Sequence, residues 1–257
     1  MKSDFIDWIK VSVDYEIEYS KARGGVLEIY PDFIHISNKK VPYGGDYNRT
    51  VEVKTREIKR FKEIIKIVER IHKANRVFPP DRFDFMPPKL DSEWENVPKS
   101  LGYNLKTSVY LKSSVLFNKF SLYPYNLYFP SEKEFKEWYI KQQKTKPYWT
   151  ENILEKIVFL QIDFIKVFKP FWLMKDEEIV GWVYCQLYKD FFHVFELELI
   201  EKYRGKGIGR IFIELIKIEA CRCGAKFVII QTNPEIKNFY IKCGFDVISE
   251  NSVLIKK

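Results

Sequence analysis

Residues 201–210, EKYRGKGIGR, lie between an apolar run with strand character and a run with helical spacing. The segment places three of the chain's 11 glycines within five positions, beside arginine and lysine. A strand that continues through closely spaced glycines into a helix leaves several backbone N–H groups unpaired at the helix start. These groups and the helix dipole favour a bound anion such as phosphate. The segment therefore predicts a phosphate-binding loop.

Three known phosphate-binding loops differ in the residues that they require. A P-loop needs serine or threonine directly after its Gly-Lys pair, and this segment has neither there. The dinucleotide fingerprint Gly-x-Gly-x-x-Gly would need glycine at position 210, where the chain has arginine. The third pattern is Arg/Gln-x-x-Gly-x-Gly/Ala, and Arg204, Gly207 and Gly209 fit it.

A second motif follows this loop. Residues 233–245, NPEIKNFYIKCGF, combine an asparagine, a short helical stretch with a Phe-Tyr pair, and a terminal Gly-Phe. Together with the loop, this motif resembles the GNAT acetyltransferases, in which the loop binds the pyrophosphate of acetyl-CoA. The resemblance covers the last half of the chain, from about Ser131 to Lys257, where the order of predicted elements also matches.

The resemblance implies a fold class and an activity. The fold would be α+β, with a central, twisted and mostly antiparallel sheet flanked by helices. The activity would be N-acetyl transfer, with acetyl-CoA as cofactor and a primary amine of a small molecule, protein or peptide attacking directly in a ternary complex. A non-catalytic acyl-CoA-binding sensor or interaction protein is the alternative. A nucleic-acid-binding protein is a third, weaker hypothesis.

Hydrophobic spacing predicts elements along the whole chain. We expect a hairpin at 24–36 and an amphipathic helix with Thr55 as N-cap at 55–76. Ser131 and Glu134 form a capping-box pattern before a helix. The proline-rich segment 78–91 is expected to interrupt regular structure. The other expected elements are a short helix within 91–103 closed by Gly102, a strand at 107–117, a helix at 151–167, strands at 170–176, 177–190 and 191–200, a helix ending near Cys223, a strand at 225–233, a helix at 234–244, and closing strands at 245–248 and 252–257.

Two segments of the chain resemble each other. Residues 101–112, LGYNLKTSVYLK, and residues 243–256, CGFDVISENSVLIK, share glycine, an aromatic residue and a Ser-Val-aliphatic-Lys pattern, and each follows a predicted short helix. A chance likeness is the alternative to a repeat. As a repeat, they predict two tandem GNAT-like domains. We expect a degenerate GNAT-like or accessory domain at 1–113, without the glycine loop, and an acetyltransferase domain at 114–257.

The resemblance also implies cofactor-binding positions. The N–H groups of the loop would hold the diphosphate, and its basic side chains would add charge. Backbone groups of the preceding strand would bond to the pantetheine arm. The residues concerned are Leu197, Leu199 and Ile200 of the strand and Arg204, Gly205, Lys206, Gly207, Ile208, Gly209 and Arg210 of the loop. Core packing is the alternative for the leucines, and a simple turn is the alternative for Gly205.

Three side chains are candidates for further roles. Asn233 would approach the cofactor arm, or cap the helix that begins with Pro234. Tyr240 matches the family's Phe-Tyr position and would protonate the departing thiolate, with packing between helix and strand as the alternative. Glu196 is the candidate general base, because it alternates with Glu198 on one face of the strand. That face could equally be exposed to solvent, and the resemblance does not decide which residue is the base.

Composition limits the remaining classes. The formal charge of +8 arises from 43 basic and 35 acidic residues, but lysine is scattered, which favours a solvated surface over a nucleic-acid platform. The four cysteines and three histidines lack the spacing of a metal site. Free thiols and the absence of a signal-like or membrane-length apolar run predict a cytoplasmic protein. Its expected partners are acetyl-CoA and an amine acceptor, without a membrane, and a homodimer is left open.

Overall fold

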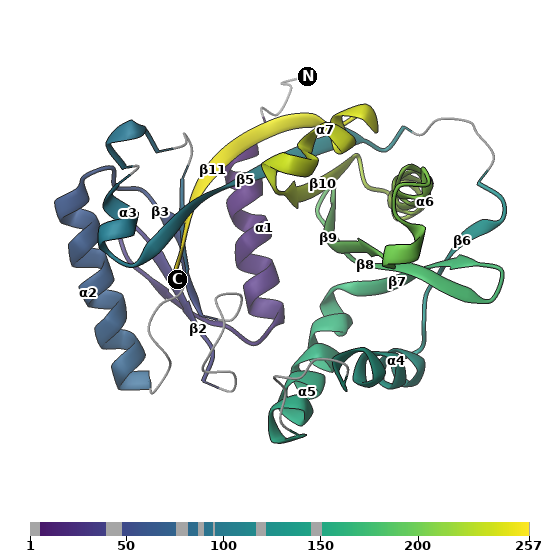
Figure 1. Cartoon of the computed structure of the whole chain (residues 1–257), viewed down its shortest axis with the longest axis horizontal. Helices are drawn as coiled ribbons and strands as arrows, with labels where there is room; N and C mark the ends of the chain where they lie inside the picture. Colours follow the sequence, from purple (N-terminus) through teal and green to yellow (C-terminus); the bar gives the residue numbers. More distant parts are fainter. Residues whose placement is uncertain are drawn as a thin grey trace. The chain divides into compact units, whose positions relative to one another are not determined.

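The computed structural model describes residues 6–39, 48–75, 82–86, 90–94, 96–116, 122–144 and 151–256 (Figure 1). The chain forms two compact units. The first consists of Met1–Tyr110 together with Ile248–Lys257, and the second of Leu111–Val247. The last ten residues thus belong to the unit that begins the chain. Among the described residues, no helix has both the length and the apolar character needed to cross a membrane.

The first unit is built on a mixed sheet with the strand order β1-β2-β3-β4-β11-β5. Strands β1, β2 and β3 are antiparallel, β3 and β4 are parallel, and β4 and β11 are antiparallel. The expected hairpin at 24–36 is confirmed as β1 and β2, with Val26 opposite Ser37. The elements are α1 (Trp8–Ala22), β1 (Val26–Ile29), β2 (Ile34–Ser37), β3 (Arg49–Val53), α2 (Ile58–Asn75), β4 (Arg82–Phe85), a 3-10 turn (Ser92–Trp94), α3 (Val97–Ser100) and β5 (Tyr103–Ser114).

The second unit has the strand order β5-β10-β9-β8-β7-β6, where β5 contributes its last residues. Strands β6 to β9 are antiparallel, and β9 and β10 are parallel. Helices α4 and α5 cover one face of these strands and α6 lies over the other (Figure 1). The elements are β6 (Tyr125–Tyr128), α4 (Glu132–Lys144), α5 (Glu151–Val167), β7 (Lys169–Lys175), β8 (Glu178–Tyr188), β9 (Phe191–Leu199), a 3-10 turn (Glu201–Tyr203), α6 (Ile208–Arg222), β10 (Phe227–Thr232), α7 (Pro234–Lys242) and β11 (Asp246–Lys256).

Each unit repeats the same order of elements. Three antiparallel strands are followed by a helix, a strand parallel to the third, a short helix and a long strand. Gly102 and Gly244 end the short helices with φ of 79° and 83°, a conformation that favours glycine. Glu52 in β3 and Glu196 in β9 both have a left-handed backbone, with φ of 55° and 49°. The fold is therefore mixed α+β with an internal repeat, as the two similar segments predict.

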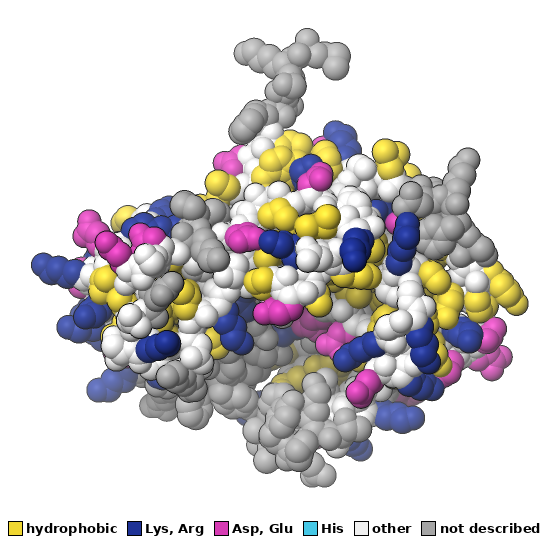
Figure 2. Space-filling model, turned by 45° about the horizontal axis from the view of Figure 1, so that its top comes forward, with side chains coloured by type: hydrophobic (Ala, Val, Ile, Leu, Met, Phe, Trp, Pro, Cys, Tyr) yellow, Lys and Arg dark blue, Asp and Glu magenta, His cyan; other side chains and the backbone are white. Residues whose placement is uncertain are grey.

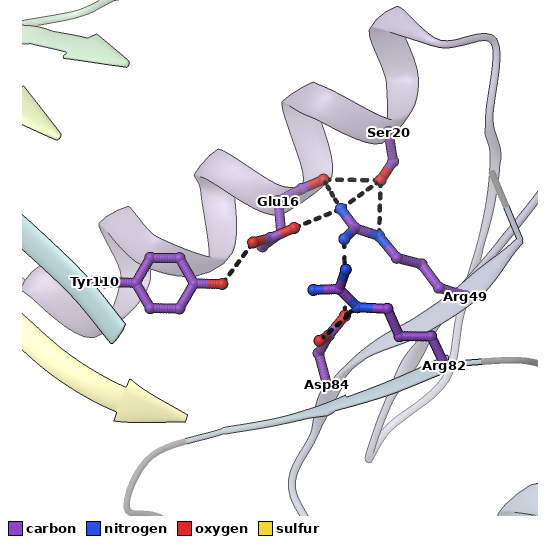
Figure 3. Close-up of polar contacts among 6 residues, drawn as sticks. All are labelled: Glu16, Ser20, Arg49, Arg82, Asp84 and Tyr110. Carbon is purple, nitrogen blue, oxygen red and sulfur yellow. Dashed lines mark hydrogen bonds and ion pairs between the residues drawn. The ribbon is translucent and has the colours of Figure 1, made fainter. Parts of the chain in front are cut away.

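The two faces of β4 meet different surroundings in the first unit. Phe83 and Phe85 pack against Phe61 of α2, with ring centroids 5.2 Å apart in each pair. Arg82 and Asp84 alternate with these phenylalanines and therefore lie on the face of β4 opposite to them. That face holds a buried ionic cluster, which we define by the side chains drawn in Figure 3: Glu16 and Ser20 of α1, Arg49, Arg82, Asp84 and Tyr110.

Several parts of the chain differ from the sequence-based predictions. Helix α1 and strands β3 and β6 were not predicted. Strand β4 lies inside the proline-rich segment 78–91, where no regular structure was expected. The two expected closing strands form one continuous strand, β11, in which Ser249 and Asn251 between them are buried. The capping box at Ser131 is confirmed, since its backbone N–H donates to Glu134 Oε2 at 2.8 Å.

Candidate active site

The strands β9 and β10 part from each other before they end. Their parallel pairing runs from Phe191 and Phe227 to Val194 and Ile230. Strand β9 continues to Leu199 and β10 to Thr232, but no further pair joins them. Because β8 pairs with only one edge of β9, the other edge of residues 195–199 borders an opening in the sheet. An extended polar ligand could bond to the backbone there.

The backbone groups at this opening are not equally available. The N–H of Ile200 donates to Val180 O at 3.0 Å, and its carbonyl accepts from the N–H of Tyr203 at 2.9 Å. The carbonyl of Leu199 accepts from Arg204 Nε at 2.9 Å. Of the three strand residues expected along the cofactor arm, both backbone groups of Ile200 and the carbonyl of Leu199 are therefore occupied.

A β-bulge interrupts β9 at the opening. The register between β8 and β9 shifts between Trp182 and Tyr184, and Glu196 on the opposite strand takes its left-handed conformation there. Bulges redirect a strand and its side chains, and they are frequent beside active sites. Glu196 and Glu198 are both exposed. The structure therefore places the candidate base at the point where β9 leaves β10.

The three glycines of the loop serve different purposes. Gly205 and Gly207 have φ of 73° and 76°, and a β-carbon at either position would meet no atom within 4 Å. Glycine is needed there for backbone conformation, and the space beside it is open. A β-carbon on Gly209 would instead lie 3.1 Å from Phe239 Cζ. Gly209 therefore permits the close contact between α6 and α7.

The start of α6 presents a row of free backbone donors. Among the described residues, no acceptor is found for the N–H groups of Lys206, Gly207, Ile208 and Gly209. The N–H of Arg210, by contrast, donates to Gly207 O at 3.0 Å. Helix α6 has 15 residues, so its dipole adds partial positive charge at this end. The arrangement suits a diphosphate, and four of the five amides expected to bind one are available.

Basic side chains surround these donors. Arg204, Lys206 and Arg210 are all exposed. The bond from Arg204 to Leu199 O connects the loop to the end of β9, so this arginine has a structural contact besides its charge. At the start of the loop, Lys202 Nζ lies 2.5 Å from Glu178 Oε1, and Tyr203 also bonds to Glu178. No sequence pattern indicated these contacts, because Glu178 lies in another strand.

Asn233 follows β10 on the opposite side of the opening. It occupies the N-cap position of α7, with Pro234 next, but its side chain makes no capping hydrogen bond. The side chain is exposed. The expected side-chain cap is therefore not formed, and the amide group is available to a ligand.

Tyr240 is held in the interior of the second unit. Its side chain is 4% exposed and packs against Phe239 and Phe245, with ring centroids 5.0 and 5.7 Å away. Burial raises the pKa of the Tyr240 phenol well above its usual range, and the nearby Cys243 adds a smaller effect in the same direction. The phenol therefore carries its proton at neutral pH. Among the described residues, none hydrogen-bonds to this hydroxyl.

Comparisons with known proteins agree with this geometry. Residues 168–247 match the family described as "Acetyltransferase (GNAT) domain". None of the curated proteins matches the chain. Residues 168–247 contain the loop, the parted strands β9 and β10, and α7, and they are a GNAT acetyltransferase domain. The family is thus established for this domain, which spans residues 168–247 of the 257-residue chain.

Several solved structures share the fold over nearly the whole chain. A functionally unknown conserved protein from Staphylococcus epidermidis has a TM-score of 0.69 at 11% identity, covering 90% of this chain and 94% of that one. A GCN5-related N-acetyltransferase from Kribbella flavida has a TM-score of 0.64 at 10% identity, covering 97% and 95%. Another from Sphaerobacter thermophilus has a TM-score of 0.58 at 10% identity, covering 96% and 91%. At such identities the likeness concerns the fold.

Proposed function

We propose that the chain is an N-acetyltransferase that moves the acetyl group of acetyl-CoA to a primary amine in a ternary complex. The family supports acyl transfer from a CoA thioester. The observation that carries the proposal is the set of free N–H groups at Lys206, Gly207, Ile208 and Gly209, which lie beside the opening between β9 and β10. Donors for a diphosphate and an open strand edge for an amide arm are what CoA requires.

Glu196, Tyr240 and the backbone amides of the loop would each contribute to the reaction. Acetyl-CoA supplies an acetyl thioester that is open to attack. The amine must be neutral to attack, and Glu196 would accept its proton directly or through water. As the amide bond forms and the C–S bond breaks, the Tyr240 hydroxyl would give its proton to the departing sulfur. The amides of the loop and the edge of β9 would hold the thioester between these two groups.

Charge on the surface favours a small or peptide acceptor over nucleic acid. On the face drawn in Figure 2, lysine and arginine side chains are interspersed with aspartate and glutamate. A nucleic-acid platform would need one continuous basic area. Among the described residues, no group of three His, Cys, Asp or Glu side chains could hold a metal ion. We propose that the acceptor is an amine of a small molecule, protein or peptide in the cytoplasm.

Gly207→Glu tests the cofactor site. The substitution would place a carboxylate where the diphosphate is proposed to bind, and like charges in contact cost several kcal/mol, so we expect acetyl-CoA affinity to fall about 100-fold or more. Isothermal titration measures it. The matched control is Gly224→Glu at the other end of α6, where φ is 80° and a β-carbon also meets no atom within 4 Å.

Both substitutions strain a left-handed residue, and we expect each to cost about 1–2 kcal/mol of stability. Only the change at Gly207 should abolish binding. Equal affinities in the two variants would overturn the proposed site. If the wild type binds acetyl-CoA but consumes none of it with any member of a panel of amines, amino acids and peptides, the sensor hypothesis replaces the enzyme.

A further inference from the structure

Helix α6 carries a buried lysine beside the C-terminal end of α7. Lys217 is 2% exposed, and its Nζ donates to Cys243 O at 2.6 Å. The carboxylate of Glu214, one turn earlier on α6, is fully buried, with Oε1 3.6 Å from the same Nζ. Lysine and glutamate are almost never fully buried without a partner. A buried pair of opposite charges therefore sits against the end of the neighbouring helix.

A second side chain reaches the same turn from β5. The hydroxyl of Ser113 donates to Gly244 O at 2.9 Å, and Ser113 is 3% exposed. Cys243 is the C-cap of α7, and Gly244 follows it with φ of 83°. The last carbonyls of a helix have no partner within it, and a cation at this end also matches the helix dipole. Lys217 thus supplies a donor to the carbonyl of the cap residue, and the Ser113 hydroxyl, which also lies 3.0 Å from Ser114 O, supplies one to the glycine after it.

The same turn connects directly to Tyr240. The N–H groups of Cys243 and Phe245 both donate to the Tyr240 carbonyl, at 2.9 and 3.1 Å. The ring of Phe245 packs against the ring of Tyr240, and Lys217 Nζ lies 5.3 Å from the centre of the Phe245 ring. The lysine therefore contacts both the backbone turn and the aromatic side chain that hold Tyr240.

We propose that Lys217, with Glu214 and Ser113, is a positioning group that fixes the Tyr240 hydroxyl by anchoring the C-terminal turn of α7. This inference rests on the proposed function, in which Tyr240 is the proton donor. Lys217 touches neither cofactor nor acceptor in this role. It fixes the position of the C-terminal end of α7, and thereby the distance of the Tyr240 hydroxyl from the opening between β9 and β10.

Tyrosine labelled at Cζ with carbon-13 allows the position of Tyr240 to be followed by NMR. The signal is assigned among the 16 tyrosines by its absence in Tyr240→Phe. In the wild type we expect no titration between about pH 8 and 11, because burial raises the pKa of this phenol. In Lys217→Met we expect the signal to move and to titrate near the ordinary value of about 10.

The direction of this change separates movement from simple loss of charge. Removal of a nearby positive charge would by itself raise the pKa of a phenol, whereas entry of water lowers it. A lowered pKa therefore reports that α7 has moved. The matched control is Lys242→Met, which removes an exposed lysine from the last turn of α7 and should leave the Tyr240 signal as it is.

Turnover provides the second readout. With an amine that the wild type acetylates, Lys217→Met should lower kcat about tenfold while acetyl-CoA affinity changes little, because a small misplacement affects mainly the chemical step.

If Lys217→Met folds and its Tyr240 signal and titration match the wild type, the inference is wrong. If Lys217→Met does not fold, Ser113→Ala decides, because it removes one of the two donors and should shift the signal in the same direction. A wild type that binds no acetyl-CoA refutes the proposed function, while the NMR comparison still judges the role of Lys217.

Discussion

Single residues decide whether the opening between β9 and β10 can catalyse a reaction or only bind a ligand. In the proposed function Tyr240 is the proton donor, and burial raises the pKa of its phenol, so that the group stays neutral. Its identity was predicted from the Phe-Tyr motif. Its surroundings were not, because Lys217 and Ser113 come from elements that no local spacing relates to α7.

Tyr240→Phe removes the proposed proton donor without a large change in packing. We expect kcat to fall by about 100-fold or more, within the range that general acids contribute, and acetyl-CoA affinity to stay within about twofold of the wild type. Steady-state kinetics with titration calorimetry measures both. Unchanged kcat would remove Tyr240 from the chemistry and leave only its packing role.

Two histidines make stability depend on pH. Burial lowers the pKa of both His193 and His35 to about 3, and for His35 the neighbouring His72 adds to this effect. Both therefore stay neutral in the folded protein while the unfolded chain gains protons below a pKa of about 6.5. The free energy of unfolding should fall with falling pH by about 1.4 kcal/mol per pH unit for each histidine, from about pH 6.5 towards 3.

His193→Phe tests this dependence, because phenylalanine does not titrate and the neighbours Phe191 and Phe195 are aromatic. Urea unfolding between about pH 6 and 5, above the pKa range of ordinary carboxylates, gives the free energy of unfolding at each pH. We expect this free energy to change with pH by about 1.4 kcal/mol per pH unit less in the variant than in the wild type. At pH 8 the histidine is neutral in both states and contributes nothing to the slope. An identical slope in variant and wild type would contradict the assignment.

At the scale of elements, the two units differ in how the helix directly before their three repeated strands, α1 or α5, is attached to the sheet. In the second unit, Phe164 of α5 stacks at 4.7 Å on Phe168, the residue directly after the helix, and Phe168 packs on Phe195 at 4.6 Å. In the first unit, α1 is held by the ionic cluster of Figure 3, where Arg49 binds Glu16 Oε2 at 2.5 Å and Tyr110 donates to Glu16 Oε1 at 2.5 Å.

This difference explains why one helix was predicted and the other was not. Half of the buried residues of α1 are the polar Ser12, Glu16 and Ser20, which leaves a narrow apolar row of Val11, Tyr15 and Tyr19. Helix α5 and the amphipathic α2 have apolar residues at the expected spacing. Periodicity predicts a helix from the apolar residues of its buried face, and it fails where half of that face is polar and bonds to residues distant in sequence.

Arg49→Met should test the ionic cluster. It leaves the buried carboxylates of Glu16 and Asp84 without their shared partner, and we expect a loss of about 3–5 kcal/mol. The double variant Arg49→Met, Glu16→Leu removes the charge together with its partner, so it should be less destabilised than the sum of the two single changes. Urea unfolding of all four proteins measures this coupling. Strict additivity would show that the two side chains do not interact.

At the scale of the whole molecule, the repeat gives each unit a corresponding pair of parallel strands, and in the described residues of the first unit this pair stays closed. In the first unit β3 and β4 remain paired past the bulge at Glu52, since the N–H of Met86 donates to Val53 O at 3.0 Å. The loop before α2 has no glycine and is closed by its own contacts: the Arg56 side chain bonds to Met86 O, and the Trp94 indole donates to Arg56 O.

We therefore expect one acetyl-CoA to bind per chain. Titration calorimetry should give a stoichiometry near one for the wild type and no measurable binding for Gly207→Glu. A second binding event that survives Gly207→Glu would place a cofactor in the first unit. The absence of a glycine loop from the first half was visible in the sequence, but the closed pairing of β3 and β4 was not, because it joins strands on either side of α2.

The first unit is assembled from two segments far apart in the chain, and this affects folding during synthesis. Strand β11 pairs with β4 through Val253, Leu254 and Ile255, so residues 248–256 fill a place in the sheet of the unit translated first. A ribosome releases residues 1–110 long before those that complete their sheet. During synthesis the first unit therefore has β4 without this neighbour. An unpaired strand edge of this kind can form wrong strand pairs and is a binding site for chaperones.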